Sequence, residues 1–426
     1  MKIGKLSKII YLCFLIFISL TYCLISKIKI QEDILCQMFP TDNIWNTPID
    51  SLPVHPNSDN YINAVGASKP FHPDFAAALN TDVPYGIPYM IVPGTQPKVK
   101  VTFDYPDESD GSFYPIPLNP LIEGGATSTG DRHILIVDKD NLLLYELYSA
   151  YPNTDGTWRA GSSSIFNLNS DTLRPDGWTS CDAAGLPILP GLVRYDEVAK
   201  GEIKHAIRFT IPNTLNAYLW PARHKASSKT DPALMPMGLR IRLKQGYDIS
   251  GFSAENQVIL KAFKKYGLLL ADNGSPWFFT GVGDARWNDD DLNNLKKLKG
   301  SDFEALDESS LMIDPNSGRA KQSTTESGVK YIYGIEDLNL SCSPNPFTNT
   351  LSIRYDNPVT QKVKITINDI FGNSVNTICD VTQPSGHCEC KWDGNNSKGF
   401  FACSGIYFIR IETRNSLSVC PVSFIK

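Results

Sequence analysis

Short runs of alternating apolar and polar residues, separated by Gly, Pro and Asn, recur along this sequence and leave little room for a helical fold. Toward the carboxyl end they occupy 351–355, 363–367 and 406–411, with the period of half-buried β-strands. With 30 Gly, 29 Pro and 11% aromatic residues, the composition also favours a turn-rich, mainly β fold. Further runs of strand type lie at 98–103, 133–137, 142–148, 203–211 and 239–243.

Two helices are expected among the strands of the middle segment. Ser253 is a suitable N-cap, apolar residues follow it at helical spacing, and Gly267 supplies a stop. A shorter helix is expected to begin at the acidic run 289–291 and to end at 296–297, so that charges of both signs match the helix dipole. We therefore interpret the three Asp as a helix start rather than a calcium site. The segment is predicted to be a jelly-roll-like β-sandwich with one or two helices packed on it.

The amino terminus carries the pattern of an export signal. Lys2, Lys5 and Lys8 precede an apolar run over 9–25, so the chain is expected to leave the cytoplasm. Two interpretations of residues 1–30 stay open. One is a cleaved signal peptide and the other is an uncleaved anchor with its amino end inside.

Charge and local motifs exclude several classes of function. The formal net charge is −5 and no run of five or six Lys or Arg residues occurs, so nucleic acid is not an expected partner. The sequence lacks a phosphate-binding loop, a nucleophile elbow and a zincin motif, and no cofactor is implied. The segment 387–390 (His-Cys-Glu-Cys) lacks a second pair of ligands at zinc-finger spacing, so no metal is expected. Any chemistry must therefore come from scattered residues that the fold brings together.

Cysteines crowd the carboxyl-terminal part of the chain. In a small exported module an even set of six predicts a disulfide framework, although six cysteines allow 15 pairings and the sequence does not choose among them. The six are Cys342, Cys379, Cys388, Cys390, Cys403 and Cys420.

A segment rich in Pro, Gly, Ser and Thr divides the chain. Residues 314–327 contain no large apolar side chain, and we expect a linker over 314–337. It separates a β-rich segment, 37–313, from a module at 338–426. The expected domains are thus an export segment at 1–30, a β-rich candidate carbohydrate-active domain at 37–313, a linker at 314–337 and a small Ig-like β-sandwich at 338–426.

The pattern of the last module resembles a known family. The segments Ser343–Phe347, Asp369–Gly372, Trp392–Gly394 and Ser404–Tyr407 look like the type A sorting domain of the type IX secretion system, in the order that this domain shows. The resemblance implies a small Ig-like β-sandwich, the outer-membrane secretion machinery as partner, and removal of the module with attachment to the cell surface or release. The Ig-like domains of flagellar hook-capping proteins share part of the pattern, so a purely structural β-module is the alternative.

One cluster in the middle segment suits general acid/base catalysis. If 139–140 form a two-residue turn, His133 lies opposite Glu146 on the paired strand, and Asp131 lies on the same face. Glu123, in a Gly-containing loop, is able to fold over this pair. Partial burial would bring the pKa values of His133 and Glu146 toward neutrality, which is why we select Asp131, His133 and Glu146 as candidate catalytic residues. A structural ion pair at the end of a sheet is the alternative.

The remaining candidates lie in loops and are assigned to substrate binding together with Glu123. Trp220, Arg223 and His224 leave a strand together and would form an aromatic and cationic rim for a sugar or carboxylate, unless they pack as a corner. Asp182 and Asp272 lie at the ends of predicted elements, where each is a candidate second acid or a turn cap.

These observations lead to one hypothesis and one alternative. The hypothesis is an exported, cell-surface or secreted protein that acts on a polysaccharide by acid/base hydrolysis or elimination, as a glycoside hydrolase or a polysaccharide lyase. The alternative is a non-catalytic adhesin or glycan-binding protein. The segments 174–178, 186–195 and 220–224 also resemble a group of secreted bacterial proteins with no established activity, which implies an exported domain and assigns no catalytic residue.

Overall fold

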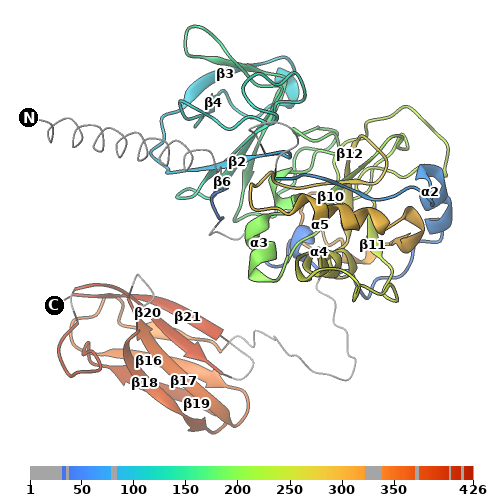
Figure 1. Cartoon of the computed structure of the whole chain (residues 1–426). Coiled ribbons are helices and arrows are strands. Elements are labelled where there is room, and N and C mark those ends of the chain that lie inside the picture. Colours follow the sequence, from blue (N-terminus) through green and yellow to red (C-terminus); the bar gives the residue numbers. More distant parts are fainter. Residues whose placement is uncertain are drawn as a thin grey trace, which may run out of the picture. The chain divides into compact units, whose positions relative to one another are not determined.

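A computed structural model of the chain (Figure 1) describes residues 31–34, 38–77, 84–321, 338–369, 374–402, 404–413 and 417–425. The export segment expected at 1–30 lies outside the described residues. Within the described ranges, no helix has the length and apolar character needed to cross a membrane. The chain divides into two compact units, Met1–Thr324 and Thr325–Lys426.

The first unit is mainly β, as predicted, with few helices. Its described strands form a six-stranded sheet in the order β1-β13-β10-β12-β11-β14 and two four-stranded sheets, β2-β5-β6-β9 and β4-β3-β8-β7. The strands are β1 (His72–Asp74), β2 (Tyr89–Val92), β3 (Val99–Phe103), β4 (Phe113–Tyr114), β5 (Ile134–Asp138), β6 (Leu143–Tyr148), β7 (Tyr151–Pro152), β8 (Trp158–Ala160), β9 (Ser162–Asn167), β10 (Ile207–Ile211), β11 (Arg240–Leu243), β12 (Leu268–Asn273), β13 (Phe278–Thr280) and β14 (Phe303–Ala305).

The strand pairing adds a feature that the sequence did not predict. The pairs β1–β13, β10–β12, β2–β5 and β3–β8 are parallel, whereas a jelly roll is built from antiparallel strands. Parallel neighbours end at the same edge of a sheet, so loops far apart in the sequence meet there. This arrangement positions the site described below.

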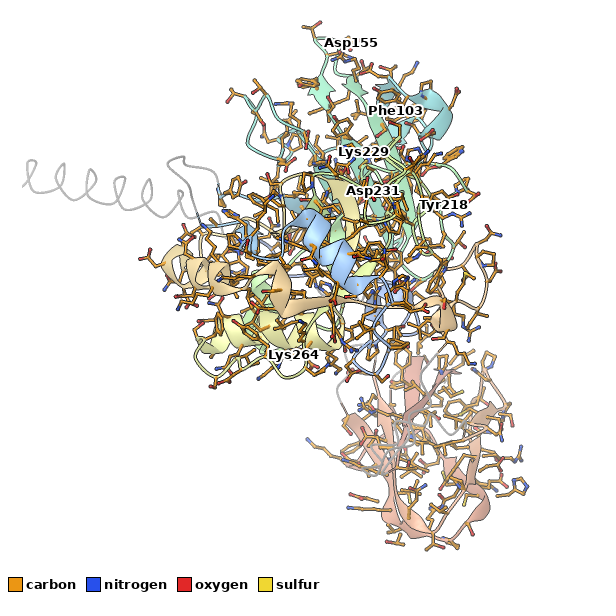
Figure 2. The ribbon with its side chains drawn as sticks, turned by 90° about the vertical axis from the view of Figure 1, so that its right-hand side faces the viewer. Phe103, Asp155, Tyr218, Lys229, Asp231 and Lys264 are labelled. Atoms are coloured by element: carbon orange, nitrogen blue, oxygen red, sulfur yellow. The ribbon has the colours of Figure 1, made fainter. Side chains whose placement is uncertain are left out.

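The helices gather at the end of the first unit away from β3 and β4 (Figure 1). Asp155, in the turn between β7 and β8, and Lys264, in a helix, lie at opposite ends of this unit (Figure 2). The α-helices are α2 (Ser58–Val65), α3 (Tyr195–Lys200), α4 (Ala254–Lys265) and α5 (Asp289–Leu292). Short 3-10 helices are η1 (Ile44–Asn46), η2 (Pro106–Glu108), η3 (Leu189–Gly191), η4 (Asn293–Lys297), η5 (Gly300–Asp302) and η6 (Ser309–Leu311).

Both expected helices are confirmed. The Ser253 hydroxyl caps α4 by accepting the backbone N–H of Asn256, and Gly267 follows the helix at a φ of +69°, which favours glycine. The acidic run 289–291 opens α5, and η4 continues it to Lys297. The buried face of α4 packs on an aromatic core that includes Phe71, Phe263, Trp277 and Phe303.

The second unit is a small β-sandwich. One described sheet has the order β15-β16-β19 and the other β18-β17-β20-β21, and their inner faces bury Ile353, Ile365, Trp392, Ile409 and Phe424. This core is separate from the cores of the first unit. The strands are β15 (Ser341–Ser343), β16 (Leu351–Asn357), β17 (Gln361–Asn368), β18 (Ser374–Gln383), β19 (Gly386–Trp392), β20 (Gly405–Glu412) and β21 (Leu417–Phe424).

The predicted disulfide framework is absent from the described residues of this unit. Its five described cysteines are free thiols, and Cys403 lies outside the described residues. Several of these thiols approach backbone carbonyl groups instead. Cys379 contacts the Val363 oxygen at 3.6 Å and Cys388 contacts the Gly386 oxygen at 3.7 Å.

The start of the expected linker is hydrogen bonded to the first unit. The backbone N–H of Ala320 donates to Asp42 over 2.8 Å, and the N–H of Lys321 donates to Leu311 over 2.7 Å. Isolated bridges also join Arg319 to Asn43. Polar composition therefore did not prevent residues 314–321 from packing against the first unit.

Candidate active site in an acidic cleft

Two neighbouring hollows of the first unit, of about 530 and 720 Å³, form one two-lobed cleft. They share Asp131, His133, Asp272 and Asn273, which therefore lie where the lobes meet. The first lobe is also lined by Asp74, Tyr85, Glu123, Arg208, Thr210 and Phe278. The second lobe is also lined by Asp104, Tyr105, Glu108, Tyr148, Asp182 and His224.

A β-bulge places Asp272 at the junction of the lobes. β10 and β12 run parallel, but their register shifts after Phe209, so that Ala271 is an extra residue and Asp272 lies beside Thr210. Bulges of this kind redirect a side chain and interrupt strand pairing. The Asp182 loop is fixed beside the same strand, because the N–H of Ala184 donates to the Ala271 oxygen over 2.9 Å.

Asp182 and Arg208 form a buried, bidentate ion pair. The Nε and Nη2 atoms of Arg208 donate to the two carboxylate oxygens of Asp182 over 2.6 and 2.7 Å, and the Asp182 side chain is fully buried. A third guanidinium nitrogen donates to the Thr280 hydroxyl over 2.6 Å. Arg208 and Asp182 thus pair in the bidentate geometry that is strongest for a guanidinium and a carboxylate.

Asp272 has the properties of a proton donor. Burial, together with the adjacent negative charge of Asp182, raises the pKa of Asp272 to about 7 despite the nearby Arg208, and a hydrogen bond to Asp182 adds to the rise. Two carboxyl groups in contact cannot both ionise easily, so the more exposed one keeps its proton. The Asp272 side chain is 31% exposed and faces the cleft. Near neutral pH a substantial fraction of Asp272 is therefore a carboxylic acid that a ligand in the cleft is able to reach.

His133 is fixed in a buried ion pair with Glu123. Its Nδ1 lies 2.6 Å from Glu123 Oε2 and its Nε2 lies 3.2 Å from the Cys181 carbonyl oxygen. Both partners are acceptors, so the geometry suits an imidazolium that donates from both nitrogens. Burial alone would lower the pKa of His133, but the Glu123 charge and hydrogen bond raise it to about 9. The same contacts lower the pKa of Glu123 against the opposing effect of its burial. The predicted loop contact is therefore present.

The register predicted for β5 and β6 is wrong by two residues. Leu135, not His133, pairs with Glu146, because Asp138 begins a longer turn than the predicted 139–140. The Asp138 carboxylate accepts two backbone N–H groups of that turn, over 3.3 and 3.0 Å, and so competes with the shorter turn. A shift of two keeps His133 and Glu146 on one face of the sheet, but not as a direct cross-strand pair.

Glu146 lies behind the cleft rather than on its surface. Its side chain is fully buried and accepts the backbone N–H groups of Ile188 and Leu189 over 2.9 and 3.0 Å. Burial raises the pKa of Glu146 to about 7, against the effect of these hydrogen bonds. Glu146 does not line either lobe. Its contacts are those of a cap on the loop that opens η3.

The predicted rim is only partly at the cleft. His224 lines the second lobe, whereas Trp220 and Arg223 bind the 315–317 segment. The indole N–H of Trp220 donates to the Ser317 oxygen over 2.8 Å, and Arg223 donates to the Pro315 oxygen over 2.6 Å. Of the two open interpretations, the contacts of Trp220 and Arg223 match the packed corner.

Sequence reasoning missed Arg208 and the tyrosines of the cleft. Arg208 lies within the apolar strand β10, and a buried charge requires a partner of opposite charge. An arginine in such a run therefore could have indicated a buried ion pair. Tyr85 and Tyr105 are 40% and 64% exposed and gave no signal, because they follow turn residues rather than a strand pattern. Four tryptophans of this unit, Trp45, Trp158, Trp277 and Trp287, are buried and therefore present no exposed ring to a sugar.

The described residues at the junction of the two lobes are acids and hydrogen-bonding groups. Across the described ranges, no group of three His, Cys, Asp or Glu side chains is arranged to hold a metal ion. The junction instead presents the Asp272 carboxyl group and the exposed Asp131 side chain to one space. A proton donor and a carboxylate on one cleft are the groups that general acid/base chemistry requires.

Comparison with known proteins bears on the second unit. Residues 348–416 match the family model of the FlgD Ig-like domain, which identifies this unit as an Ig-like module. No curated protein matches the chain. Latent PorU from Porphyromonas gingivalis is 20% identical, with 20% of this chain and 9% of PorU covered and a TM-score of 0.18. FlgD from P. aeruginosa is 25% identical, with 18% of this chain and 58% of FlgD covered and a TM-score of 0.15.

A wider but weaker likeness exists to PorZ of P. gingivalis, described as a surface component of the type-IX secretion system. It is 11% identical, and the alignment covers 74% of this chain and 48% of PorZ with a TM-score of 0.18. This chain therefore spans less than two thirds of each of these three proteins. TM-scores this low establish no common overall fold.

Proposed function

We propose that the chain is an exported hydrolase that cleaves a neutral polysaccharide in the cleft of its first unit. The observation that carries the proposal is the Asp272 carboxyl group, which faces the cleft beside the Asp182–Arg208 pair and whose pKa is raised to about 7, so that a substantial fraction of it is protonated near neutral pH. In this mechanism Asp272 protonates the leaving oxygen of the glycosidic bond, and Asp131 activates a water molecule. Arg208 and the His133–Glu123 pair are positioning residues.

The charge of the cleft favours hydrolysis over elimination. Elimination from a uronic acid unit requires cations that neutralise the substrate carboxylate. No lysine occurs among the described residues that line the cleft. Arg208 is engaged by Asp182, and the His133 imidazolium is engaged by Glu123. Carboxylates, amides and hydroxyls dominate the lining and suit the hydroxyl groups of neutral sugars. An anionic polymer would be repelled.

Export to the cell surface or medium is the second part of the proposal. The sorting-like segments at 343–347 and 392–394 and the Ig-like match of 348–416 support delivery by the outer-membrane machinery of type IX secretion. The flagellar Ig-like domain shares this fold, so the match supports the module more directly than the route. An adhesin that uses the same cleft without turnover is the alternative function.

A turnover assay with paired variants tests the proposal. The full chain is incubated with xylan, mixed-linkage β-glucan, galactomannan and α-glucan, with alginate and polygalacturonate as anionic controls, and released reducing ends are measured. We expect cleavage of at least one neutral polymer, lost in Asp272→Asn and retained in the matched exposed-loop variant Asp155→Asn. Retention of a polymer without turnover would support the adhesin instead, and equal turnover by Asp272→Asn would refute the assigned acid.

A further inference from the structure

The cleft extends to both sides of its acid. Asp131 and Asp272 lie at the junction of the lobes, and each lobe continues away from them with its own lining residues. The volumes of about 530 and 720 Å³ are of similar size, and both hollows open to solvent. A site that trims chain ends needs one closed side, because the terminal sugar must stop there. Neither lobe provides that stop.

Each lobe also presents an exposed tyrosine ring. In the first lobe, Tyr85 is 40% exposed and its hydroxyl donates to Asp74 Oδ1 over 2.5 Å, which fixes the ring. In the second lobe, Tyr105 is 64% exposed, and its backbone N–H donates to the Gly161 oxygen over 2.9 Å. Exposed aromatic rings at a polar cleft are suited to stacking on the apolar faces of sugars.

From this arrangement we propose that a polysaccharide chain passes through both lobes, stacks on Tyr85 on one side and Tyr105 on the other, and is cleaved internally. This inference rests on the proposed function for its cleavage step, but the binding step stands by itself. Contacts that bind the substrate far from the reacting bond also hold that bond in place at the acid. Both tyrosines are therefore expected to contribute to cleavage as well as to affinity.

Two measurements on the full chain separate the binding step from the cleavage step. The first is retardation of the Asp272→Asn protein in native gels that contain each neutral polymer of the turnover panel. Tyr85→Ala and Tyr105→Ala, each introduced into this protein, are expected to weaken retention by about three- to tenfold. Tyr85→Phe and Tyr105→Phe keep the ring, and Phe113→Ala removes an exposed ring outside the cleft. Phe113→Ala is expected to leave retention unchanged, and the two Phe variants are expected to weaken retention less than the corresponding Ala variants do.

The second measurement is the size distribution of products during early turnover by the wild-type protein. Internal cleavage produces long fragments first, with a large loss of viscosity for few new reducing ends. Short products of one size from the start would overturn internal cleavage, and retention that depends on only one tyrosine, or on neither, would overturn the spanning groove. Retention that needs both rings without any turnover would refute the proposed hydrolase while leaving the groove in place.

Discussion

At the residue scale, the chemistry depends on the location of one proton between two carboxyl groups. Arg208 neutralises Asp182 through two hydrogen bonds, which leaves the proton on Asp272. Sequence analysis selected both aspartates separately but did not predict their contact, because it arises from a bulge after Phe209 and from the hydrogen bond between Ala184 and Ala271. Neither feature has a signature in the sequence of a single strand or loop.

The proton on Asp272 predicts a pH dependence of activity. With a pKa of about 7, the fraction of protonated Asp272 falls as the pH rises through 7, so kcat/KM is expected to fall over the same range. Asp272→Asn removes the acid and is expected to lower kcat by about 100-fold or more. A pH–rate profile of the wild type tests this, and a profile that stays flat from pH 6 to pH 9 would contradict it.

His133 predicts a pH dependence of stability. Its pKa is about 9 in the folded protein against 6.5 as the ordinary value, so its contribution is complete below pH 6.5 and is lost as the pH rises through 9. We expect this contribution to be about 3 kcal/mol. In denaturant unfolding, His133→Gln is expected to be less stable than the wild type at pH 6. This difference is expected to disappear above pH 9. His387→Gln, at an exposed side chain, is the control and should behave as the wild type.

At the scale of elements, Glu146 connects β6 to the loop that opens η3. Its carboxyl group accepts the N–H groups of Ile188 and Leu189, which have no partner within the short helix. The sequence placed Glu146 correctly on a strand and on the face of His133, but the longer turn that begins at Asp138 changed its neighbours. Strand positions and faces were thus predictable from alternation, whereas turn length depended on a side-chain hydrogen bond.

Substitution of Glu146 separates its capping role from catalysis. The pKa of Glu146 is raised to about 7 in the folded protein, so the contribution of this group to stability is complete below pH 4.5 and falls by about 3 kcal/mol as the pH rises through 7. Glu146→Gln keeps an acceptor for both N–H groups and is expected to remove this fall and retain turnover. Glu146→Leu leaves both N–H groups unpaired and is expected to cost about 2 to 4 kcal/mol. Loss of turnover in a folded Glu146→Gln protein would contradict this role.

At the scale of the whole chain, the two units have separate hydrophobic cores. The class of each was predictable from the sequence, because strand alternation and turn residues are local signals. The parallel pairs of the first unit were not, because pairing between distant strands has no local signal. Composition also carried no sign of the hydrogen bonds by which Arg223 and Trp220 bind the polar 315–317 segment.

Truncation tests whether each unit acts independently. A chain that ends at Thr324 keeps the complete core and cleft of the first unit, so its unfolding midpoint and turnover are expected to equal those of the full chain. In the native host, the same truncation is expected to stop export to the surface or medium. Fractionation and thermal unfolding measure the two effects. A truncated chain that still reaches the surface would contradict delivery by the second unit.

The titration of Asp272 itself is the most direct measurement. Carboxyl carbon chemical shifts of protein labelled with ¹³C at Asp are followed from pH 3 to pH 9, and the Asp272 signal is assigned by its loss in Asp272→Asn. We predict a midpoint near 7 for Asp272. A midpoint at the ordinary Asp value of about 4 would contradict a protonated acid in the cleft and the hydrolase that depends on it.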